Sequence, residues 1–155
     1  PTKNGYDSIE FLISTNPGES IKPLGKIASG GELSRIMLAI KTILSGEEGV
    51  ETLIFDEIDT GISGITAQMV AGKLTQIAKS CQVLCITHLA QIACMADSHY
   101  LIEKRVIDDR TVTKIRELGE EESIEELARI VGGAQITDTV LNSAREMKEL
   151  AKRTK

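Results

Sequence analysis

Two adjacent carboxylates, Asp56 and Glu57, stand directly after an apolar run at residues 52–55. Such a run is typical of a strand buried on both faces, as in a parallel sheet flanked by helices. Ligands of these sheets bind beyond the carboxyl ends of the strands, where the two side chains would lie. One carboxylate could hold a divalent cation there, and its neighbour could orient and deprotonate a water molecule. The plainer alternative is that acidic residues end the strand because the chain reaches solvent.

A second stretch suited to chemistry is Ser29-Gly30-Gly31-Glu32, which opens a predicted helix that ends at Gly46. An N-cap at Ser29 and a capping-box partner at Glu32 would explain the helix start. They do not explain two consecutive glycines in the first turn, because glycine lowers helix stability. Bare backbone at a helix N-terminus offers N–H groups and the positive end of the helix dipole to a phosphate. We therefore favour a phosphate contact for this stretch.

The helix that follows has apolar residues at i, i+3, i+4 and i+7 spacing, which predicts one buried face. The residues expected on that face are Leu33, Ile36, Met37, Ile40, Ile43 and Leu44. Arg35 and Lys41 fall largely on the opposite face.

His88 follows the next expected strand, residues 82–87, which a predicted helix at 65–79 separates from the strand at 52–57. Strand, helix and strand in this order form a βαβ unit, so we expect parallel strands with a right-handed crossover. Parallel strands end at the same edge of a sheet, and His88 should therefore emerge beside the two carboxylates. A histidine at a strand tip is usually only solvated or hydrogen-bonded, but this position makes it a candidate to contact the same ligand.

The composition indicates one domain. A chain of 155 residues can bury roughly 68–70% of its unfolded surface. No apolar run approaches the ~20 residues of a membrane span, and the start shows no signal-peptide pattern. The net charge of −5 argues against a nucleic-acid groove formed by this chain alone.

The three cysteines, Cys81, Cys85 and Cys94, are expected to be buried free thiols of a reducing compartment. A zinc site would have to combine them with His88. However, Cys81 and Cys85 fall at opposite ends of one predicted strand, ~13 Å apart. That separation is too large for a single metal ion.

The other expected segments follow from turn and capping signals. In chain order they are a strand at 8–14, a turn at 16–18, an irregular stretch at 19–27, a short helix at 89–95, a strand at 99–103, a hairpin at 104–118 around Asp108-Asp109, a helix opened by a capping box at 123–126 and ended by Gly132-Gly133, and an amphipathic helix from Thr137 to about Arg153.

The order of these chemical stretches is similar to that of ABC-type ATPase heads. In that family Ser-Gly-Gly-Glu is the signature motif, Asp56-Glu57 is the Walker B element, Asp59 lies in the D-loop, and His88 stands at the switch histidine. Transporters of this family usually carry Gln at the position of Glu32. A Glu at this position resembles the signature motif of the chromosome-maintenance and DNA-repair branch. Four longer strings resemble the RecN family of bacterial DNA repair proteins over nearly the whole chain: FLISTNPG (11–18), KIASGGELSR (26–35), IFDEIDTG (54–61) and VLCITHLAQ (83–91).

RecN proteins are coiled-coil ATPases of the structural-maintenance-of-chromosomes (SMC) type that act in double-strand break repair. The resemblance implies an α/β fold with a mostly parallel sheet, flanking helices, a C-terminal hairpin and two helices. No Gly-x-x-x-x-Gly-Lys-Ser/Thr phosphate loop occurs in the sequence. Residues 1–155 are therefore expected to be the C-terminal half of an ABC/SMC-type head. The N-terminal half, with Walker A, and the coiled coil would lie outside this chain.

The resemblance also implies ATP and Mg²⁺ as cofactors and gives each motif a role. Asp56 would hold Mg²⁺, Glu57 would position the attacking water, and His88 would contact the γ-phosphate. The signature residues of a second head would close over the same nucleotide, and Asp59 would couple the two sites. Those signature residues are Ser29, Gly30, Gly31 and Glu32.

The implied partners are the protein's own N-terminal half, a second head in a homodimer, and DNA through the intact protein. No membrane is implied, and the expected location is the bacterial cytoplasm at the nucleoid. The chain alone should be inactive as an ATPase. Two alternatives stay open, an ABC ATPase lobe of another system such as a transporter subunit, and a non-hydrolysing binding module that kept the fold.

Overall fold

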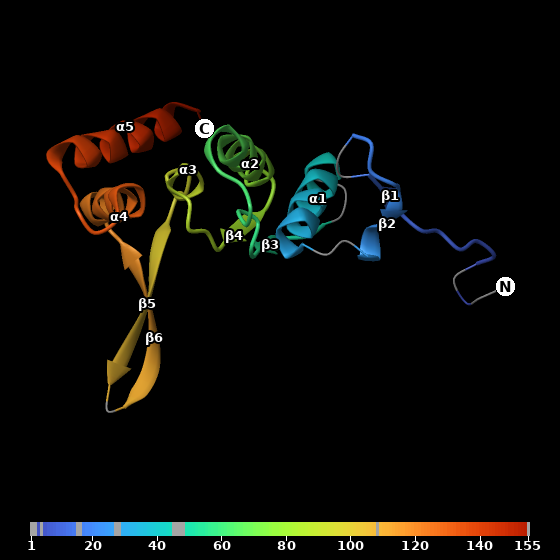
Figure 1. Ribbon diagram of the computed structural model, residues 1–155, viewed down its shortest axis with the longest axis horizontal. Helices are drawn as coiled ribbons and strands as arrows, with labels where there is room; N and C mark the ends of the chain where they lie inside the picture. Colours follow the sequence, from blue (N-terminus) through green and yellow to red (C-terminus); the bar gives the residue numbers. More distant parts are fainter. Residues whose placement is uncertain are drawn as a thin grey trace.

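The computed structural model describes residues 3, 5–14, 17–26, 29–44, 49–107 and 109–154 (Figure 1). The expected turn at 16–18 and hairpin tip at 108–109 lie partly outside these residues, and the expected helix end at Gly46 lies wholly outside them. The elements are, in chain order, β1 (Leu12–Ile13), β2 (Lys22–Pro23), a 3₁₀ turn (Leu24–Lys26), α1 (Gly30–Ile43), β3 (Thr52–Phe55), α2 (Gly64–Ile77), β4 (Gln82–Cys85), α3 (Ala90–Ala93), β5 (His99–Ile107), β6 (Arg110–Leu118), α4 (Glu120–Gly132) and α5 (Asp138–Thr154).

The centre of the fold is the predicted βαβ unit. Strands β3 and β4 pair in parallel, with Thr52 opposite Gln82 and Phe55 opposite Cys85. Helix α2 connects them, because its small and aliphatic residues recur on one face and bury against the strands. The buried residues of α2 are Ala67, Val70, Ala71, Leu74 and Ile77. The prediction of parallel strands is confirmed.

The expectation of a mostly parallel sheet is met only in part, by the β3–β4 pair. Within the described residues, the other two strand pairs, β1–β2 and β5–β6, are antiparallel. A parallel pair needs a crossover through a helix, whereas strands that follow each other directly turn back as hairpins. Of the three strand pairs among the described residues, only β3–β4 is joined through a helix, and it is the parallel pair. The predicted strand at 8–14 shrinks to two residues, and its partner β2 lies in the stretch expected to be irregular.

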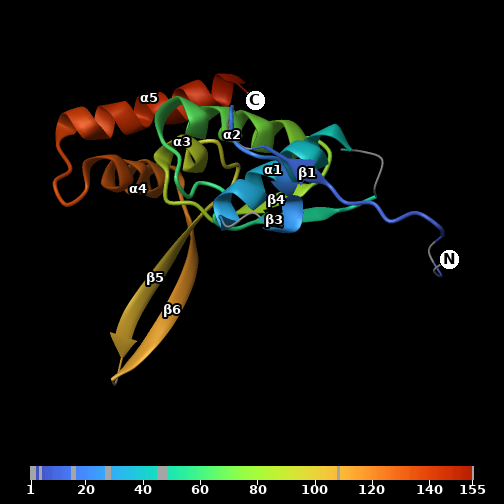
Figure 2. The ribbon, with the colours of Figure 1, turned by 45° about the vertical axis from the view of Figure 1, so that its right-hand side comes forward.

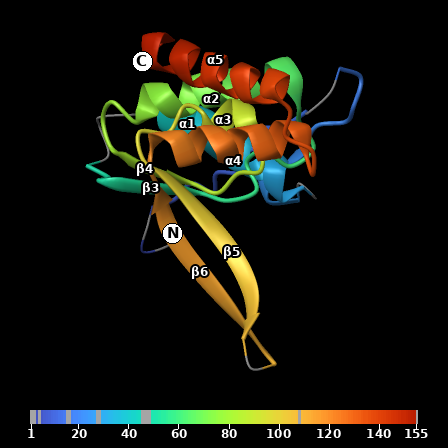
Figure 3. The same ribbon diagram turned by 90° about the vertical axis from the view of Figure 1, so that its left-hand side faces the viewer.

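Helices cover one face of the β3–β4 pair, as Figures 2 and 3 show. Phe55 points to that side and is buried with Leu38 of α1 and Leu74 of α2. On the other side, Ile54 is 68% exposed and Leu84 is 47% exposed. The prediction that β3 is buried on both faces is therefore wrong for this chain. One apolar face is open to solvent.

A second core joins α3, α4 and α5. Leu127 and Ala128 of α4 and Ala144 of α5 are fully buried there, together with Ala90 and Ala93 of α3. The amphipathic helices at 120–132 and 138–154 thus pack through the faces that their periodicity predicts. Among the described residues, no helix is both long and apolar enough to cross a membrane.

Helix α4 begins at Glu120, and its cap lies four residues before the predicted cap at Ser123. Gly119 takes the N-cap position, and the Glu122 carboxylate accepts a hydrogen bond from the Gly119 N–H at 3.0 Å. Three glutamates then occupy the first turn, where the helix dipole favours negative charge. Ser123, expected to cap the helix, lies inside it and is buried.

The hairpin β5–β6 projects from the body of the molecule (Figures 1 to 3). Its two strands of nine residues pair in register from His99 opposite Leu118 to Ile107 opposite Arg110. The hairpin is confirmed, but its first strand runs four residues beyond the predicted end at 103.

Candidate functional site

The carboxyl ends of β3 and β4 bring three predicted site residues to one edge. Asp56 and Glu57 follow β3, and His88 follows β4 after Ile86 and Thr87. The pairing continues past the strands, because the Ile86 N–H donates to the Phe55 carbonyl at 3.0 Å. The two loops therefore leave the sheet side by side, as the βαβ prediction requires.

Asp59 connects these two loops from within the chain. Its side chain is only 3% exposed. Carboxylate atom Oδ2 accepts hydrogen bonds from the Thr87 hydroxyl at 2.6 Å and the His88 N–H at 2.7 Å. Nδ1 of His88 lies 3.0 Å from the same oxygen. A buried carboxylate is costly unless hydrogen bonds satisfy it, and here the donors come from the histidine loop.

This arrangement orients the His88 ring. The His88 side chain is 70% exposed, but its Nδ1 is directed at Asp59. Nε2, on the far side of the ring, is the nitrogen available to a ligand. Such a carboxylate partner fixes the tautomer and the orientation of an imidazole. Thr87 belongs to the same cluster, because its Oγ accepts from the Leu89 N–H at 3.1 Å while its hydroxyl donates to Asp59.

Glu57 has an unusual backbone conformation for a residue with a side chain. Its φ is +57°, in the left-handed region that costs an L-residue about 1–2 kcal/mol. Two local hydrogen bonds hold the turn. The Glu57 N–H donates to Asp56 Oδ1 at 2.9 Å, and the Thr60 N–H donates to the Glu57 carbonyl at 3.0 Å. Strain of this kind persists only where surrounding contacts enforce it, and it is common at functional sites.

The start of α1 lies against this turn. Ser29 has extended backbone and its side chain accepts from the Glu32 N–H at 3.4 Å, so the predicted N-cap is confirmed. A Cβ on Gly30 would collide with the Glu57 carboxylate. A Cβ on Gly31 would lie 2.9 Å from the Thr60 carbonyl oxygen and 3.0 Å from that of Glu57. Close approach of the chain's own backbone is thus a physical reason for Gly31, whereas the neighbour of Gly30 is the end of a flexible side chain.

Two further residues of α1 reach the same turn and were missed at the sequence level. The Ser34 hydroxyl donates to the Asp56 carbonyl at 2.9 Å. Arg35 Nη1 donates to the carbonyls of Ile58 and Thr60 at 3.1 and 2.8 Å.

The expected placement of Arg35 away from the packed face is therefore wrong. The face of α1 that meets the rest of the chain carries Gly31, Arg35 and Leu38, spaced at four and three residues. Leu33 and Met37, expected to be inward, are both more than one-third exposed.

Cys85 lies behind the carboxylate turn at the end of β4. Burial, and after it the negative charges of Asp59 and Asp56, together raise the pKa of its thiol to about 11. The thiol is therefore neutral at physiological pH. None of the three cysteines is in a disulfide; Cys94 is buried, and Cys81 and Cys85 are partly buried.

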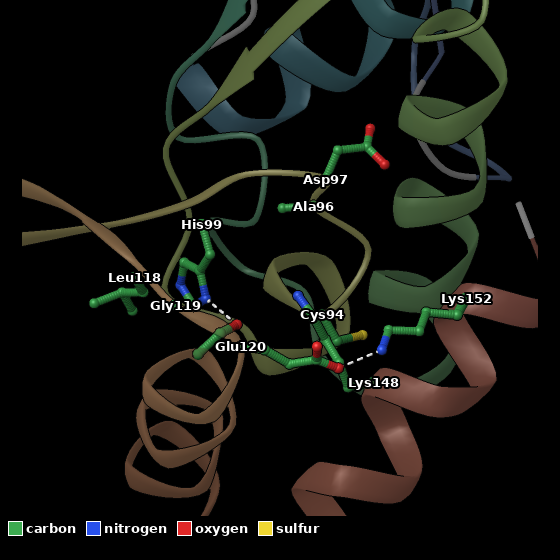
Figure 4. Close-up of a pocket in the computed structure, with 10 residues that line it drawn as sticks. Cys94, Ala96, Asp97, His99, Leu118, Gly119, Glu120, Lys148 and Lys152 are labelled. Atoms are coloured by element: carbon green, nitrogen blue, oxygen red, sulfur yellow. Dashed lines mark hydrogen bonds and ion pairs between the residues drawn. The ribbon is translucent and has the colours of Figure 1, made fainter.

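A separate cavity of about 340 Å³ lies at the base of the hairpin, between α4 and α5 (Figure 4). His99 borders it, and Nδ1 of this ring forms a 2.8 Å hydrogen bond with the Ser123 hydroxyl. Burial lowers the pKa of His99, the nearby Lys148 charge lowers it further, and Glu126 opposes the change. An ion pair between Lys152 and Glu120 closes another side. The carboxylates and His88 at the sheet edge are not among the residues that line this cavity.

The residues at the sheet edge fit a magnesium–phosphate ligand better than a metal held by protein alone. Among the described residues, no group of three or more His, Cys, Asp or Glu side chains could enclose a metal ion. Mg²⁺ is usually held by one or two carboxylates together with substrate phosphates and water. The exposed carboxylate of Asp56 is a suitable oxygen ligand for that kind of site.

Curated relatives share the sequence along almost all of the chain. "DNA repair protein RecN" of Halalkalibacterium halodurans is 52% identical over 149 residues, 96% of this chain. The protein of the same name from Bacillus subtilis is 48% identical over 154 residues, and that of Deinococcus radiodurans is 45% identical over 147. The chain belongs to the RecN family. It spans about a quarter of the length of these RecN relatives. No protein-family model matches the chain.

A solved structure supports the fold independently. A chain from work on ATP-driven dimerization and DNA-stimulated activation of SMC ATPases superposes with a TM-score of 0.50 and 24% identity, covering 77% of this chain and 79% of that one. The RecN-family chain therefore has a mixed α/β fold similar to that of an SMC ATPase. The expected resemblance to this class is confirmed at the level of fold.

Proposed function

We propose that this chain is the C-terminal half of the ATPase head of a RecN-type protein that acts in DNA double-strand break repair. The observation that carries the proposal is the convergence of Asp56, Glu57 and His88 at one sheet edge in a RecN-family chain. The buried Asp59 carboxylate ties the loops that bear them. The first residues of α1, Gly30 and Gly31, lie against the same edge of the sheet.

In this proposal Asp56 is the protein's ligand to Mg²⁺, which would offset charge on the phosphates of ATP. Glu57 holds the attacking water and takes its proton, because its exposed carboxylate stands next to the metal ligand. Nε2 of His88 contacts the γ-phosphate, while Asp59 keeps the ring in place through Nδ1. Positioning and charge stabilisation of this kind supply most of the rate in phosphoryl transfer.

The Ser29–Glu32 stretch would face the nucleotide of a second head. Gly30 is exposed, and its N–H belongs to the helix terminus that favours a phosphate. Gly31 is buried against the turn of its own chain. Gly31 would let the N-terminus of α1 lie close to the acidic turn. Ser29 would cap this N-terminus by accepting a hydrogen bond from the Glu32 N–H. Asp59 would couple the two sites by carrying changes in its own loop to His88.

The open face of the β3–β4 pair supports the remaining partner proposal. Ile54, Leu84 and Ile86 leave apolar surface exposed there, and patches of this kind mark surfaces that another element covers. We assign that element to the N-terminal half of the same head, which would also bring the phosphate loop. DNA contact, head dimerisation and a location at the nucleoid are proposed for the intact protein only.

The test is Glu57→Gln in the full-length protein. The substitution keeps the size of the side chain and its hydrogen bonding but removes the base. ATP binding should persist, turnover should fall by a factor on the order of 10²–10⁴, and ATP should trap the head dimer. Glu117→Gln, the same change at an exposed carboxylate of the hairpin, is the matched control and should hydrolyse ATP normally.

Radioactive phosphate release and size-exclusion chromatography with ATP measure the two outcomes. Near-parental turnover by Glu57→Gln would show that Glu57 is not the base. The 155-residue chain alone should show negligible turnover, because the phosphate loop is not in its sequence. Turnover by this chain alone would contradict a site shared with another half.

A further inference from the structure

Arg35 makes contacts that a solvent-facing helix residue would not make. From the second turn of α1, one nitrogen of its guanidinium reaches the carbonyls of Ile58 and Thr60 at 3.1 and 2.8 Å. These two carbonyls flank Asp59 in the turn that follows Glu57. We call residues 56–60 the acid loop. Arg35 thus holds the far end of the acid loop by main-chain atoms, independently of which side chains the loop carries.

The near end of the acid loop is held by the same helix. The Ser34 hydroxyl donates to the Asp56 carbonyl at 2.9 Å. Gly31 brings the helix so close that an added Cβ would lie 3.0 Å from both the Arg35 guanidinium and the Glu57 carbonyl oxygen. Helix α1 therefore holds the acid loop before, beside and after Glu57. The β3 strand holds it at only one end.

Such anchoring is what the backbone of Glu57 requires. A left-handed φ of +57° is unfavourable for glutamate and relaxes unless the flanking residues are fixed. If the carbonyls of Ile58 and Thr60 lost their donor, the loop after Glu57 would keep the contacts of Asp59 but lose this connection to α1, and the strained backbone of Glu57 could relax. The Glu57 carboxylate would then leave its place beside Gly30.

We infer that Arg35 is a positioning residue that holds the acid loop in the strained conformation from which Glu57 acts. Guanidinium suits this task, because its planar, fixed donors keep a geometry that a flexible ammonium does not. Arg35 need not touch the nucleotide, since it works through the backbone on either side of Asp59. The inference rests on the proposed ATPase function of the same edge.

The test compares Arg35→Ala and Arg35→Lys in the full-length protein. Arg35→Ala should lower kcat by a factor on the order of 10², the loss that misplacement by about 1 Å produces. ATP affinity and KM should stay within about twofold, because the phosphate-binding and metal-binding atoms are elsewhere. Arg35→Lys keeps the charge and one reaching donor, so its kcat should lie between those of the parent and Arg35→Ala.

Arg129→Ala is the matched control. Arg129 also makes two hydrogen bonds, to the Glu126 carboxylate at 2.7 and 2.6 Å, but on the exposed side of α4, away from the acid loop. The Arg129→Ala variant should leave kcat unchanged. This control shows whether the fall in kcat requires the loss of Arg35 in particular.

Unchanged kcat in Arg35→Ala would overturn the inference. So would a parallel fall of kcat, ATP affinity and melting temperature in both Arg35 variants, because that result indicates a general loss of structure. Glu57→Gln, measured in the same assay, distinguishes a failure of the proposed role of Glu57 from a failure of the inference about Arg35. If Glu57→Gln turns over ATP at a near-parental rate, the proposed role of Glu57 as the base fails and the inference fails with it. If Glu57→Gln is inactive while Arg35→Ala is fully active, only the inference fails.

Discussion

Asp59 offers the sharpest test of how the two loops are held. Its Oδ2 atom accepts from the Thr87 hydroxyl and the His88 N–H, and it lies within 3.0 Å of His88 Nδ1. Asp59→Ala removes the acceptor for all three groups at once. The loop after β4 would lose its connection to the loop after β3, although neither strand is changed.

The expected loss of stability follows from those contacts. A buried donor left without a partner costs about 1–3 kcal/mol, and two donors, Thr87 and His88, lose theirs. Two terms reduce the sum. The alanine variant no longer carries the desolvation cost of a buried carboxylate, and Thr87 is only partly buried, so water can reach its hydroxyl. We expect a net destabilisation of about 2–3 kcal/mol, which for a chain of this length lowers Tm by roughly 5–10 °C.

Urea denaturation of the 155-residue chain, followed by circular dichroism, measures this change. Asp59→Asn keeps one oxygen acceptor and should lose about half as much stability. Asp56→Ala is the control in the same loop, because Asp56 is exposed and its carboxylate accepts only a local bond from Glu57. Asp56→Ala should be clearly less destabilising than Asp59→Ala. Equal effects of the two alanine variants, or no effect of Asp59→Ala, would refute the role of Asp59 as the link between the loops.

Two further predictions follow from the pKa shifts. Folding lowers the pKa of His99 from 6.5, through burial and then Lys148, so the unfolded chain binds this proton more tightly; the contribution to stability is complete above pH 6.5 and is lost as the pH falls below it. His99→Gln should therefore flatten the pH dependence of the unfolding free energy as the pH falls below 6.5, and an unchanged slope would contradict the burial argument. The rise of the Cys85 pKa from 9.0 to about 11 lowers its thiolate fraction about 100-fold, and the greater nucleophilicity of a more basic thiolate restores about tenfold. With the other two cysteines replaced by serine, iodoacetamide at pH 8 should alkylate Cys85 about tenfold more slowly than a free thiol, and Asp59→Asn should narrow that gap.

The sequence predicted the βαβ unit well because its signals are local and strong. Two apolar runs, with an amphipathic helix between them, leave little choice but a parallel pair, and their common edge then follows from geometry. The state of the outer sheet face could not be predicted in this way. Ile54 and Leu84 belong to apolar runs that are typical of strands buried on both faces. The composition of a run does not tell whether the element that covers it lies in the same chain.

Errors on the helices arose from choosing among periodic patterns. On α1 the largest aliphatic residues suggested a face through Leu33 and Met37, yet the packed face passes through Gly31 and Arg35. A glycine and an arginine contribute little to a hydrophobic pattern, although their spacing of four places them on one side. On α4 the capping-box pattern at Ser123 outweighed the three acids that precede it. Acids in a first turn are also a start signal, because the dipole favours them.

The glycine pair shows why motif chemistry and structural need have to be separated residue by residue. At the sequence level Gly30 and Gly31 gave one argument, bare backbone for a phosphate. In the structure they differ, because Gly30 is exposed beside the Glu57 carboxylate whereas Gly31 is buried against two carbonyl oxygens of the acid loop. A side chain at Gly31 would displace the backbone of Glu57 and Thr60 even if no nucleotide were present. The same helix start thus has one residue that we propose contacts a partner's phosphate and one that packs against the backbone of its own acid loop. A change at either glycine is for that reason expected to affect the role of the other.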